Sequence, residues 1–244
     1  MSRVTRVATA RGLGPLFAEP AVAAEPFPPG GGPWEVEIGF GKGRYLLRRA
    51  ALEPDVRFLG IEIAGEYFRL VARRLVRRHL ANVVLLAGEA QYFAGAILPR
   101  AFARAVHIYF PDPWPKQRHH RRRLFAPDSL DLVQGLLAPG GRLYFATDFL
   151  AYGEEVRQLL VSHPGTQVVV RDGPWPDGAR TNYEAKYIVE GRPILRLEVA
   201  FEGAAAPHPR GLHDLLVAPT RRPEPLPWAP GGTTPGGAEL IRRR

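Results

Sequence analysis

The feature that most constrains the fold is an alternation of short apolar runs with segments of helical periodicity between residues 34 and 202. The runs are rich in Val, Ile, Leu and Phe, which is typical of strands buried on both faces of a sheet. Repeated strand–helix alternation predicts an α/β fold with a mostly parallel sheet and helices on both faces. The expected strands are 34–38, 56–61, 83–86, 105–110 and 142–146, with a terminal pair at 167–171 and 194–201, and the expected helices are 44–52, 66–80, 90–98, 128–137 and 152–161.

Proline and glycine indicate where this domain begins and ends. They make up one third of residues 1–33 and one third of residues 203–244, whereas residues 34–202 carry an ordinary share. Such a proportion is typical of irregular or low-complexity segments. We therefore expect an irregular N-terminal arm at 1–33, one domain at 34–202 and a Pro/Gly-rich C-terminal extension at 203–244.

Composition excludes several classes of protein. The chain has no cysteine, which rules out disulfide scaffolds, cysteine-bound zinc, iron–sulfur clusters and thiol catalysis. No apolar run reaches the roughly 18–20 residues that span a bilayer, and no secretion signal is recognisable, so we expect a cytoplasmic protein without a membrane partner. The net charge of +9, with 30 arginines among 33 basic residues, fits a polyanionic partner and equally a coding bias toward arginine.

The loop after the first expected strand is typical of a cofactor-binding turn. Gly39, Gly41 and Gly43 let backbone approach a ligand and leave helix amides free to bind it, although a tight structural turn would also explain them. The third glycine of the dinucleotide-binding pattern would fall at Arg44, and Glu37 would repel a pyrophosphate. A ligand with an ammonium or sulfonium group suits this loop better, which favours S-adenosylmethionine over NAD.

Two further carboxylates follow the next two strands. Glu62 lies about twenty residues after the glycines, the distance at which an acid hydrogen-bonds ribose hydroxyls in nucleotide-binding folds. Glu89 follows the third strand, where it either accepts a hydrogen bond from an adenine amine or serves as an acidic residue at a helix N-terminus. Both are candidate cofactor ligands, and for Glu89 the structural alternative stays open.

The loop after the fourth strand is the most unusual segment of the chain. Three prolines within residues 111–115 stiffen it and fix Asp112 and Trp114, a carboxylate beside an aromatic plate that suits a flat polar base. A run of basic residues without any acid follows directly at 116–123. Because the run adjoins a ligand-binding edge, we interpret it as a phosphate-binding surface rather than an ordinary solvated face.

Four segments together resemble the bacterial tRNA (guanine-N7-)-methyltransferases: E-I-G-F-G-K-G at 37–43, G-I-E at 60–62, D-P-W-P-K-x-R-H-x-x-R-R at 112–123 and T-N-Y-E at 181–184. The resemblance covers about residues 34–202, and the segment at 112–123 is its most specific part. It implies a Rossmann-like class I methyltransferase fold with a mostly parallel seven-stranded sheet. It also implies an enzyme that transfers a methyl group from S-adenosylmethionine to N7 of the variable-loop guanosine, position 46, of tRNA.

The resemblance implies roles for particular residues, with Asp112 as the catalytic residue. Cofactor binding would fall to Glu37, Gly39, Gly41, Gly43, Glu62, Glu89 and Asp112, and the target nucleoside would contact Lys116, Asp148, Thr181, Asn182, Tyr183 and Glu184. From the basic run we expect phosphate contacts at Arg118, Arg121, Arg122 and Arg123. No metal site is expected, because the adjacent His119 and His120 lack a spaced third ligand.

Other interpretations stay open at this point. Another RNA base N-methyltransferase is one, because Asp-Pro-Trp-Pro is similar to loops of enzymes that methylate exocyclic amines. A non-catalytic tRNA-binding protein on the same scaffold is a second, and it would need no cofactor. The arginine-rich helix face at 69–78 is either a solvated surface or a second RNA contact, and the sequence leaves a monomer and a homodimer equally open.

Overall fold

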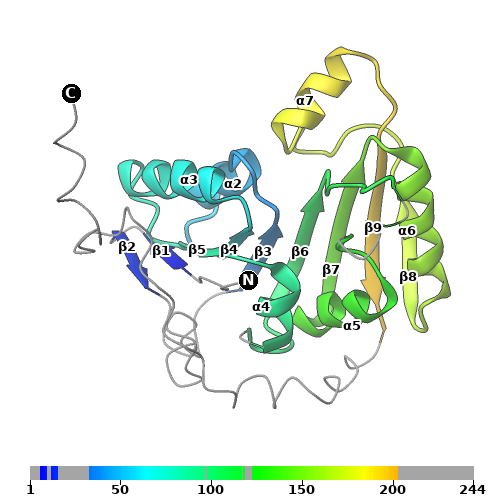
Figure 1. Ribbon diagram of the computed structural model, residues 1–244, viewed down its shortest axis with the longest axis horizontal. Helices are drawn as coiled ribbons and strands as arrows, with labels where there is room; N and C mark the ends of the chain where they lie inside the picture. The colour runs from blue at the N-terminus through cyan, green and yellow to red at the C-terminus, as the bar shows by residue number, and fades with distance from the viewer. Residues whose placement is uncertain are drawn as a thin grey trace, which may run out of the picture.

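The computed structural model describes residues 6–9, 12–15, 33–96, 98–116, 118 and 123–202. Within these ranges, a nine-stranded sheet of order β2-β1-β5-β4-β3-β6-β7-β9-β8 carries helices on both faces (Figure 1). The strands are β1 (Arg6–Thr9), β2 (Gly12–Pro15), β3 (Trp34–Ile38), β4 (Arg57–Glu62), β5 (Val83–Ala87), β6 (Ala103–Tyr109), β7 (Leu137–Thr147), β8 (Thr166–Val170) and β9 (Leu195–Phe201). The helices are α2 (Arg44–Leu52), α3 (Gly65–Arg77), α4 (Ala90–Ala96), α5 (Pro127–Leu136), α6 (Leu150–Ser162) and α7 (Asn182–Val189).

The five central strands, from β5 to β7 in the sheet order, run parallel, and β9 runs antiparallel to both β7 and β8. This confirms the expected mostly parallel sheet with a terminal pair of strands, and the structure shows that this pair is antiparallel. The register places Ile38 of β3 opposite Ile61 of β4 and Ile108 of β6, so these three strands end level with one another. The loops that follow them gather at one edge, beyond the carboxyl ends of the strands, where sheets of this kind bind ligands.

The structure differs from the sequence prediction near the N-terminus. Residues 1–33 are expected to be irregular and seven strands are expected, but β1 and β2 form an antiparallel hairpin that adds two strands. β1 pairs with β5, with Arg6 opposite Ala87 and Ala8 opposite Leu85. Without this hairpin, β5 would be an edge strand with a row of unpaired amides and carbonyls. β1 pairs with these groups although its own sequence pattern is weak, because unpaired backbone groups are costly.

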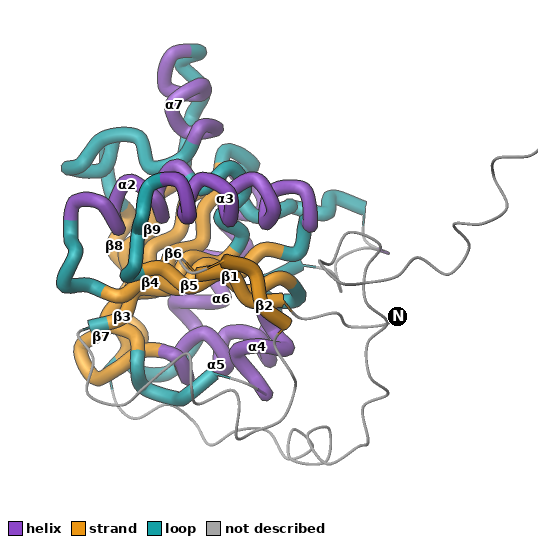
Figure 2. The backbone as a smooth tube through the Cα atoms, turned by 90° about the vertical axis from the view of Figure 1, so that its left-hand side faces the viewer, coloured by secondary structure: helices purple, strands orange, loops and turns teal. Residues whose placement is uncertain are grey.

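Two helical layers enclose the sheet (Figure 2). α2 and α3 cover one face, where Leu46 and Val71 are fully buried in one apolar cluster with Phe58 of β4. α4, α5 and α6 cover the other face, where Leu130 and Phe145 are fully buried. Burial of each such side chain stabilises the fold by about 1.5–3 kcal/mol, and the two layers together fix the strand ends that carry the site.

α7 is a helix that the sequence prediction missed. Thr181 is its N-cap, because the Thr181 hydroxyl accepts a hydrogen bond from the Glu184 amide at 3.0 Å. Thr followed three residues later by Glu is a signal for a helix start, so the T-N-Y-E segment carried the information. α7 stands beyond the carboxyl ends of β6 and β7, apart from both helical layers (Figures 1 and 2). Neither α7 nor any other helix in the described ranges is long and apolar enough to cross a membrane.

Candidate functional site

The loop between β3 and α2 is built around three glycines with a left-handed backbone. Gly39, Gly41 and Gly43 have φ values of +75°, +50° and +69°, which other residues adopt only at a cost. A Cβ atom added at Gly43 would lie 2.8 Å from Val71 of α3, whereas one at Gly39 or Gly41 would meet nothing within 4 Å. The loop is therefore packed tightly on the α3 side and leaves open space beside its first two glycines, as a backbone cradle for a ligand requires.

Glu62, at the end of β4, holds this loop from the neighbouring strand. Its carboxylate accepts one hydrogen bond from the Gly41 amide and another from the Ala64 amide, both at 2.8 Å. The sequence predicts Glu62 as an acceptor for ribose hydroxyls. Each carboxylate oxygen has two lone pairs, so the observed bonds to the loop still leave Glu62 acceptor capacity for a ligand.

Glu37 is the most perturbed carboxyl group at this edge of the sheet. It is buried at the end of β3, and its carboxylate accepts a hydrogen bond from the Leu46 amide at 3.1 Å. Burial raises the pKa of Glu37 to about 8, and repulsion from Glu62 contributes to the rise. Two carboxylates at the ends of adjacent strands favour a positively charged ligand, which would relieve this repulsion and stabilise the ionised form of Glu37.

Glu89 lies exposed beyond the end of β5, directly before α4. The preceding Gly88 has a φ of +151°, and its amide donates to the Glu62 carbonyl at 3.0 Å. This bond ties the end of β5 to the end of β4. The geometry places Glu89 on the same edge as the glycine loop, and its roles as adenine acceptor and helix N-terminal acid both stay predictions.

The loop after β6 holds two non-glycine residues in the left-handed region. Phe110 has a φ of +50° and Trp114 a φ of +41°, and the Phe110 amide donates to the Ala146 carbonyl of β7 at 2.7 Å. Such backbone strain costs about 1–3 kcal/mol per residue and persists only where the surroundings enforce it. Between these two residues, Asp112 projects from the edge of the sheet with an exposed side chain. The stiff loop expected from the three prolines is therefore also a strained one.

Arg123 is buried, whereas its predicted role as a phosphate contact requires an exposed side chain. The basic run suggests a phosphate contact, but only 8% of the Arg123 side chain is exposed. Its Nε donates to the Pro113 carbonyl at 2.8 Å, its guanidinium lies 4.8 Å from the Tyr152 ring centroid, and its Nη1 pairs with Glu155. Arg123 thus anchors the proline loop to α6, and in this position it does not face a phosphate.

The other basic residues of this run divide into two groups. Lys116 and Arg118 are exposed, as a contact with RNA requires. Arg121 and Arg122, which the sequence predicts as phosphate contacts, lie outside the described residues. Among the described residues of the run, only Lys116 and Arg118 are therefore exposed, as the predicted basic surface beside Asp112 requires.

Asp148 follows β7 at the same edge of the sheet. Its carboxylate is paired with the Arg192 guanidinium, which in turn lies 3.9 Å from the centroid of the Tyr187 ring. Because Tyr187 belongs to α7, this contact ties the C-terminal half of α7 to the end of β7. Asp148 is thus already paired, whereas Asp112 is exposed.

The predicted substrate residues of α7 also fall into different environments. Asn182 and Tyr183 are exposed, and the Tyr183 ring centroid lies 6.3 Å from that of Phe110. Glu184 is fully buried, and its carboxylate accepts from the Arg180 amide and from Arg196 Nε, each at 2.7 Å. A carboxylate buried in this way does not reach the edge of a base. It holds the start of α7 on β9 instead, while Tyr183 faces solvent next to the proline loop.

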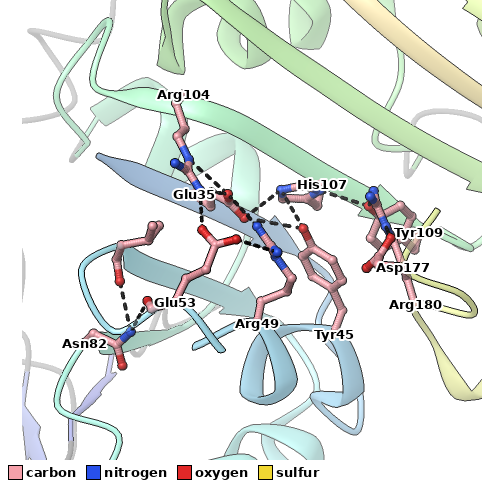
Figure 3. Close-up of polar contacts among 11 residues, drawn as sticks. Glu35, Tyr45, Arg49, Glu53, Asn82, Arg104, His107, Tyr109, Asp177 and Arg180 are labelled. Atoms are coloured by element: carbon pink, nitrogen blue, oxygen red, sulfur yellow. Dashed lines mark hydrogen bonds and ion pairs between the residues drawn. The ribbon is translucent and has the colours of Figure 1, made fainter. Parts of the chain in front are cut away.

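A buried polar cluster lies behind these loops, and the sequence prediction did not find it (Figure 3). Glu35, Tyr45, His107 and Arg180 come from β3, α2, β6 and the loop before α7. Burial alone would raise the pKa of Glu35, but His107, Arg104 and Arg49 together lower it to about 2. Burial lowers the pKa of His107, which keeps its ring neutral. No spacing in the sequence marks this cluster, because its members are far apart along the chain.

Comparison with known proteins places these residues within one matched range. The methyltransferase family model Methyltransf_4 matches residues 32–197. The tRNA (guanine-N(7)-)-methyltransferase of Nitrosococcus oceani is 36% identical over 162 residues, which cover 66% of this chain and 69% of that protein. The protein of the same name from Geobacter metallireducens is 34% identical over 183 residues, which cover 71% of this chain and 85% of that protein.

Solved structures share the fold at low sequence identity. A 16S rRNA (adenine(1408)-N(1))-methyltransferase from Catenulisporales acidiphilia, solved as a point mutant with the cosubstrate SAM, has a TM-score of 0.55 and 19% identity. The alignment covers 83% of this chain and 99% of that one. The antibiotic-resistance methyltransferase Kmr has a TM-score of 0.53 and 18% identity, with 82% and 100% covered. The sheet and its two helical layers are therefore those of a class I methyltransferase.

Proposed function

We propose that this chain, which belongs to the tRNA (guanine-N7-)-methyltransferase family, methylates the guanosine at position 46 in the variable loop of tRNA. The observation that carries the proposal is the strained loop from Phe110 to Lys116, which holds an exposed carboxylate at the edge where the glycine loop also ends. Arg123 anchors that loop from within, and the exposed Lys116 and Arg118 supply positive charge beside it. A rigid carboxylate flanked by cations suits a purine of a polyanionic substrate.

S-adenosylmethionine fits the donor set of the glycine loop. The backbone of Gly39 and Gly41 borders open space, and the two buried carboxylates Glu37 and Glu62 favour a ligand with ammonium and sulfonium charges. These four residues would hold the cofactor, with Glu89 at the neighbouring strand end. When bound, S-adenosylmethionine would supply an electrophilic methyl group to the lone pair of guanine N7, and its sulfonium sulfur would leave as a neutral thioether with the electrons of the broken S–C bond.

Asp112 orients the base and stabilises its developing charge. Guanine N7 carries no proton, so the chain needs no general base and contributes mainly alignment. A carboxylate that accepts from guanine N1–H or the 2-amino group fixes the base and stabilises the positive charge that methylation leaves on the ring. Asp148 is the other candidate, but its ion pair with Arg192 favours Asp112 for this role.

The remaining residues would grip the nucleoside and the RNA backbone. Asn182 and Tyr183 at the start of α7 are exposed, and Tyr183 offers an aromatic face beside Phe110. Thr181 and Glu184 would support these residues without contacting the nucleoside. Thr181 caps the helix, and the buried Glu184 binds Arg196 from the same turn. Phosphates would contact Lys116, Arg118, Arg121 and Arg122.

The reaction is tested by transfer of a tritium-labelled methyl group from S-adenosylmethionine to unmodified tRNA. We expect one methyl group per tRNA, recovered as 7-methylguanosine after nuclease digestion and mass spectrometry. A tRNA in which adenosine replaces the guanosine at position 46 is the control and should take up no label. Label recovered as a methylated adenosine, or equal uptake by the control tRNA, would contradict the proposal.

The role of Asp112 is tested with Asp112→Asn. We expect kcat to fall about 100-fold, because one stabilising group directed at the developing charge is lost. The matched control is Asp55→Asn, another exposed aspartate, which precedes β4 at the opposite edge of the sheet. If Asp112→Asn transfers methyl groups at the wild-type rate while both ligands still bind, Asp112 does not have this role.

A further inference from the structure

α7 contacts the body of the protein in its first turn, where Glu184 pairs with Arg196 and Asn182 accepts from Arg44 at 3.5 Å, and again at Tyr187, whose ring lies near Phe110 and Arg192. In Figures 1 and 2 it projects beyond the sheet, away from both helical layers. Asn182, Tyr183, Lys186 and Val189 are exposed along it. Besides these contacts, the position of its exposed N-terminal residues depends on what fixes the loop that leads into the helix.

The side chain that fixes this loop is Arg180. Only 11% of it is exposed, and its guanidinium lies 4.3 Å from the ring centroid of Trp175, 5.0 Å from that of Tyr144 and 5.3 Å from that of Tyr45. A fourth ring, Tyr109, lies 5.8 Å away. A guanidinium surrounded by aromatic faces gains cation–π attraction, which offsets part of the cost of its burial.

Hydrogen bonds connect Arg180 to two strands of the sheet (Figure 3). Its Nη1 donates to the Tyr109 hydroxyl at 2.6 Å, and that hydroxyl lies 2.9 Å from Nδ1 of His107. The other ring nitrogen of His107 lies 3.1 Å from the Tyr45 hydroxyl, and that hydroxyl donates to the Glu35 carboxylate at 3.3 Å. With a neutral His107 protonated at Nε2, the donors run in one direction, from Arg180 through Tyr109, His107 and Tyr45 to Glu35. The guanidinium is thus fastened to β6 and β3, which are rigid elements.

The same residue organises its own loop. Nε of Arg180 donates to Asp177 at 3.0 Å, and its backbone amide donates to Glu184 at 2.7 Å. α2 supports the loop from outside, because Arg48 donates to the Asp177 carbonyl at 2.7 Å. α2 begins in the glycine loop, so the segment ahead of α7 is also tied to the proposed cofactor side of the site.

We propose that Arg180 is a positioning residue for the tRNA nucleoside: it fixes Asn182 and Tyr183 relative to the proline loop that carries Asp112. The inference rests on the proposed function, since it concerns how that substrate is held. Only 11% of the Arg180 side chain is exposed, so Arg180 acts through its neighbours, and its loss should weaken productive binding of tRNA. Because its charge also lowers the pKa of Glu37, the loss should weaken the binding of S-adenosylmethionine too, but to a smaller extent. A lysine keeps the charge but cannot reproduce the planar fork that bonds Tyr109 and Asp177 together.

The experiment compares Arg180→Leu and Arg180→Lys with Arg171→Leu. Arg171 is the matched control, because its guanidinium also lies near Trp175, at 5.8 Å, but on a half-exposed side chain that precedes the loop. For Arg180→Leu we expect the KM for tRNA to rise at least tenfold and the Kd for S-adenosylmethionine by calorimetry to rise by a clearly smaller factor, whereas Arg180→Lys, which keeps the charge near Glu37, should leave that Kd within twofold of the wild type. Arg180→Lys should give an intermediate KM, and Arg171→Leu the wild-type value.

Amide hydrogen exchange of the protein without RNA provides a second readout. In Arg180→Leu, the amides of residues 177–189 should exchange at least tenfold faster, while those of β3 and β6 keep their protection. An unchanged KM for tRNA overturns the inference, and so does a fall in kcat alone that matches a lost fraction of cofactor-binding protein. If the wild-type protein methylates no tRNA, the proposed function fails. The exchange data then test by themselves whether Arg180 fixes the start of α7, and unchanged protection of α7 in Arg180→Leu overturns that inference.

Discussion

Replacement of Glu37 by glutamine tests the electrostatics of the cofactor loop. In the folded protein, burial and then the charge of Glu62 raise the pKa of Glu37 from 4.5 to about 8. Glutamine has the shape of the protonated acid, and its carbonyl oxygen can still accept from the Leu46 amide. The variant therefore removes the titration and keeps the hydrogen bond.

The sign and size of the effect follow from linkage. Below pH 4.5 the group is protonated in both the folded and unfolded states, so its pKa shift costs no stability. Between pH 4.5 and 8 the unfolded chain loses the proton and the folded protein keeps it, so wild-type stability falls as pH rises. At about 1.4 kcal/mol for each pH unit, the loss reaches at most about 5 kcal/mol by pH 8.

The assay is urea denaturation of wild type and Glu37→Gln, followed by tryptophan fluorescence at pH 5, 6.5 and 8. We expect the two proteins to have similar free energies of unfolding at pH 5 and the variant to be the more stable one by several kcal/mol at pH 8. Other titrating groups affect both proteins alike and cancel in the difference. A difference that stays constant within about 0.5 kcal/mol over this range would refute the reasoning.

The same group should release its proton when a cationic ligand binds. At pH 7 the free protein holds Glu37 largely protonated, and a sulfonium or ammonium charge nearby lowers its pKa. Calorimetry of S-adenosylmethionine binding in two buffers of different ionisation enthalpy should therefore detect close to one proton released by the wild type. Glu37→Gln should release none at this site and bind the cofactor more weakly.

Three further substitutions probe the packing around the site. Gly43→Ala should destabilise the fold by about 2–4 kcal/mol in urea denaturation, since its methyl group would lie 2.8 Å from a valine of α3, whereas Gly39→Ala should cost only about 1–2 kcal/mol. Arg123→Met should lower the free energy of unfolding by about 2–3 kcal/mol and lower kcat, because the bond to the Pro113 carbonyl is lost. The salt dependence of tRNA affinity, measured by filter binding, should stay as in the wild type, and a flatter dependence would mean that Arg123 contacts a phosphate after all. Glu184→Gln should cost about 3–5 kcal/mol, because Arg196 is left with an uncompensated buried charge, and replacement of both by apolar residues should recover much of that loss.

The sequence predicts well those structural features that depend on residues close together in the chain. The strand 34–38 and the helix 44–52 have the bounds in the structure that the sequence predicts, because their apolar pattern is strong and local. The three glycines of the cofactor loop are predictable for the same reason, since a left-handed turn needs glycine wherever it occurs. β1 and β2 escape the prediction, because their pairing depends on a vacant strand edge and not on their own pattern.

The site residues that behave differently from prediction depend on distant partners. Arg123 reads as part of a basic run, and its burial follows from Tyr152 and Glu155 on a helix about thirty residues later. Glu184 reads as an exposed motif acid, and its burial follows from Arg196 on the last strand. A motif shows which residues stand together in the chain, but the partners that bury a side chain come from the assembled fold.

The pairing of β1 with β5 has a consequence for how the chain can be shortened. A truncated protein that begins at residue 33 keeps the five central strands but loses the hairpin, so β5 presents an open row of backbone donors and acceptors. Such an edge invites a second molecule to add a strand, and the truncated protein should associate in a concentration-dependent way that light scattering would detect. We therefore expect the β1–β2 hairpin to limit such association, and fusions that must leave the protein monodisperse should retain it.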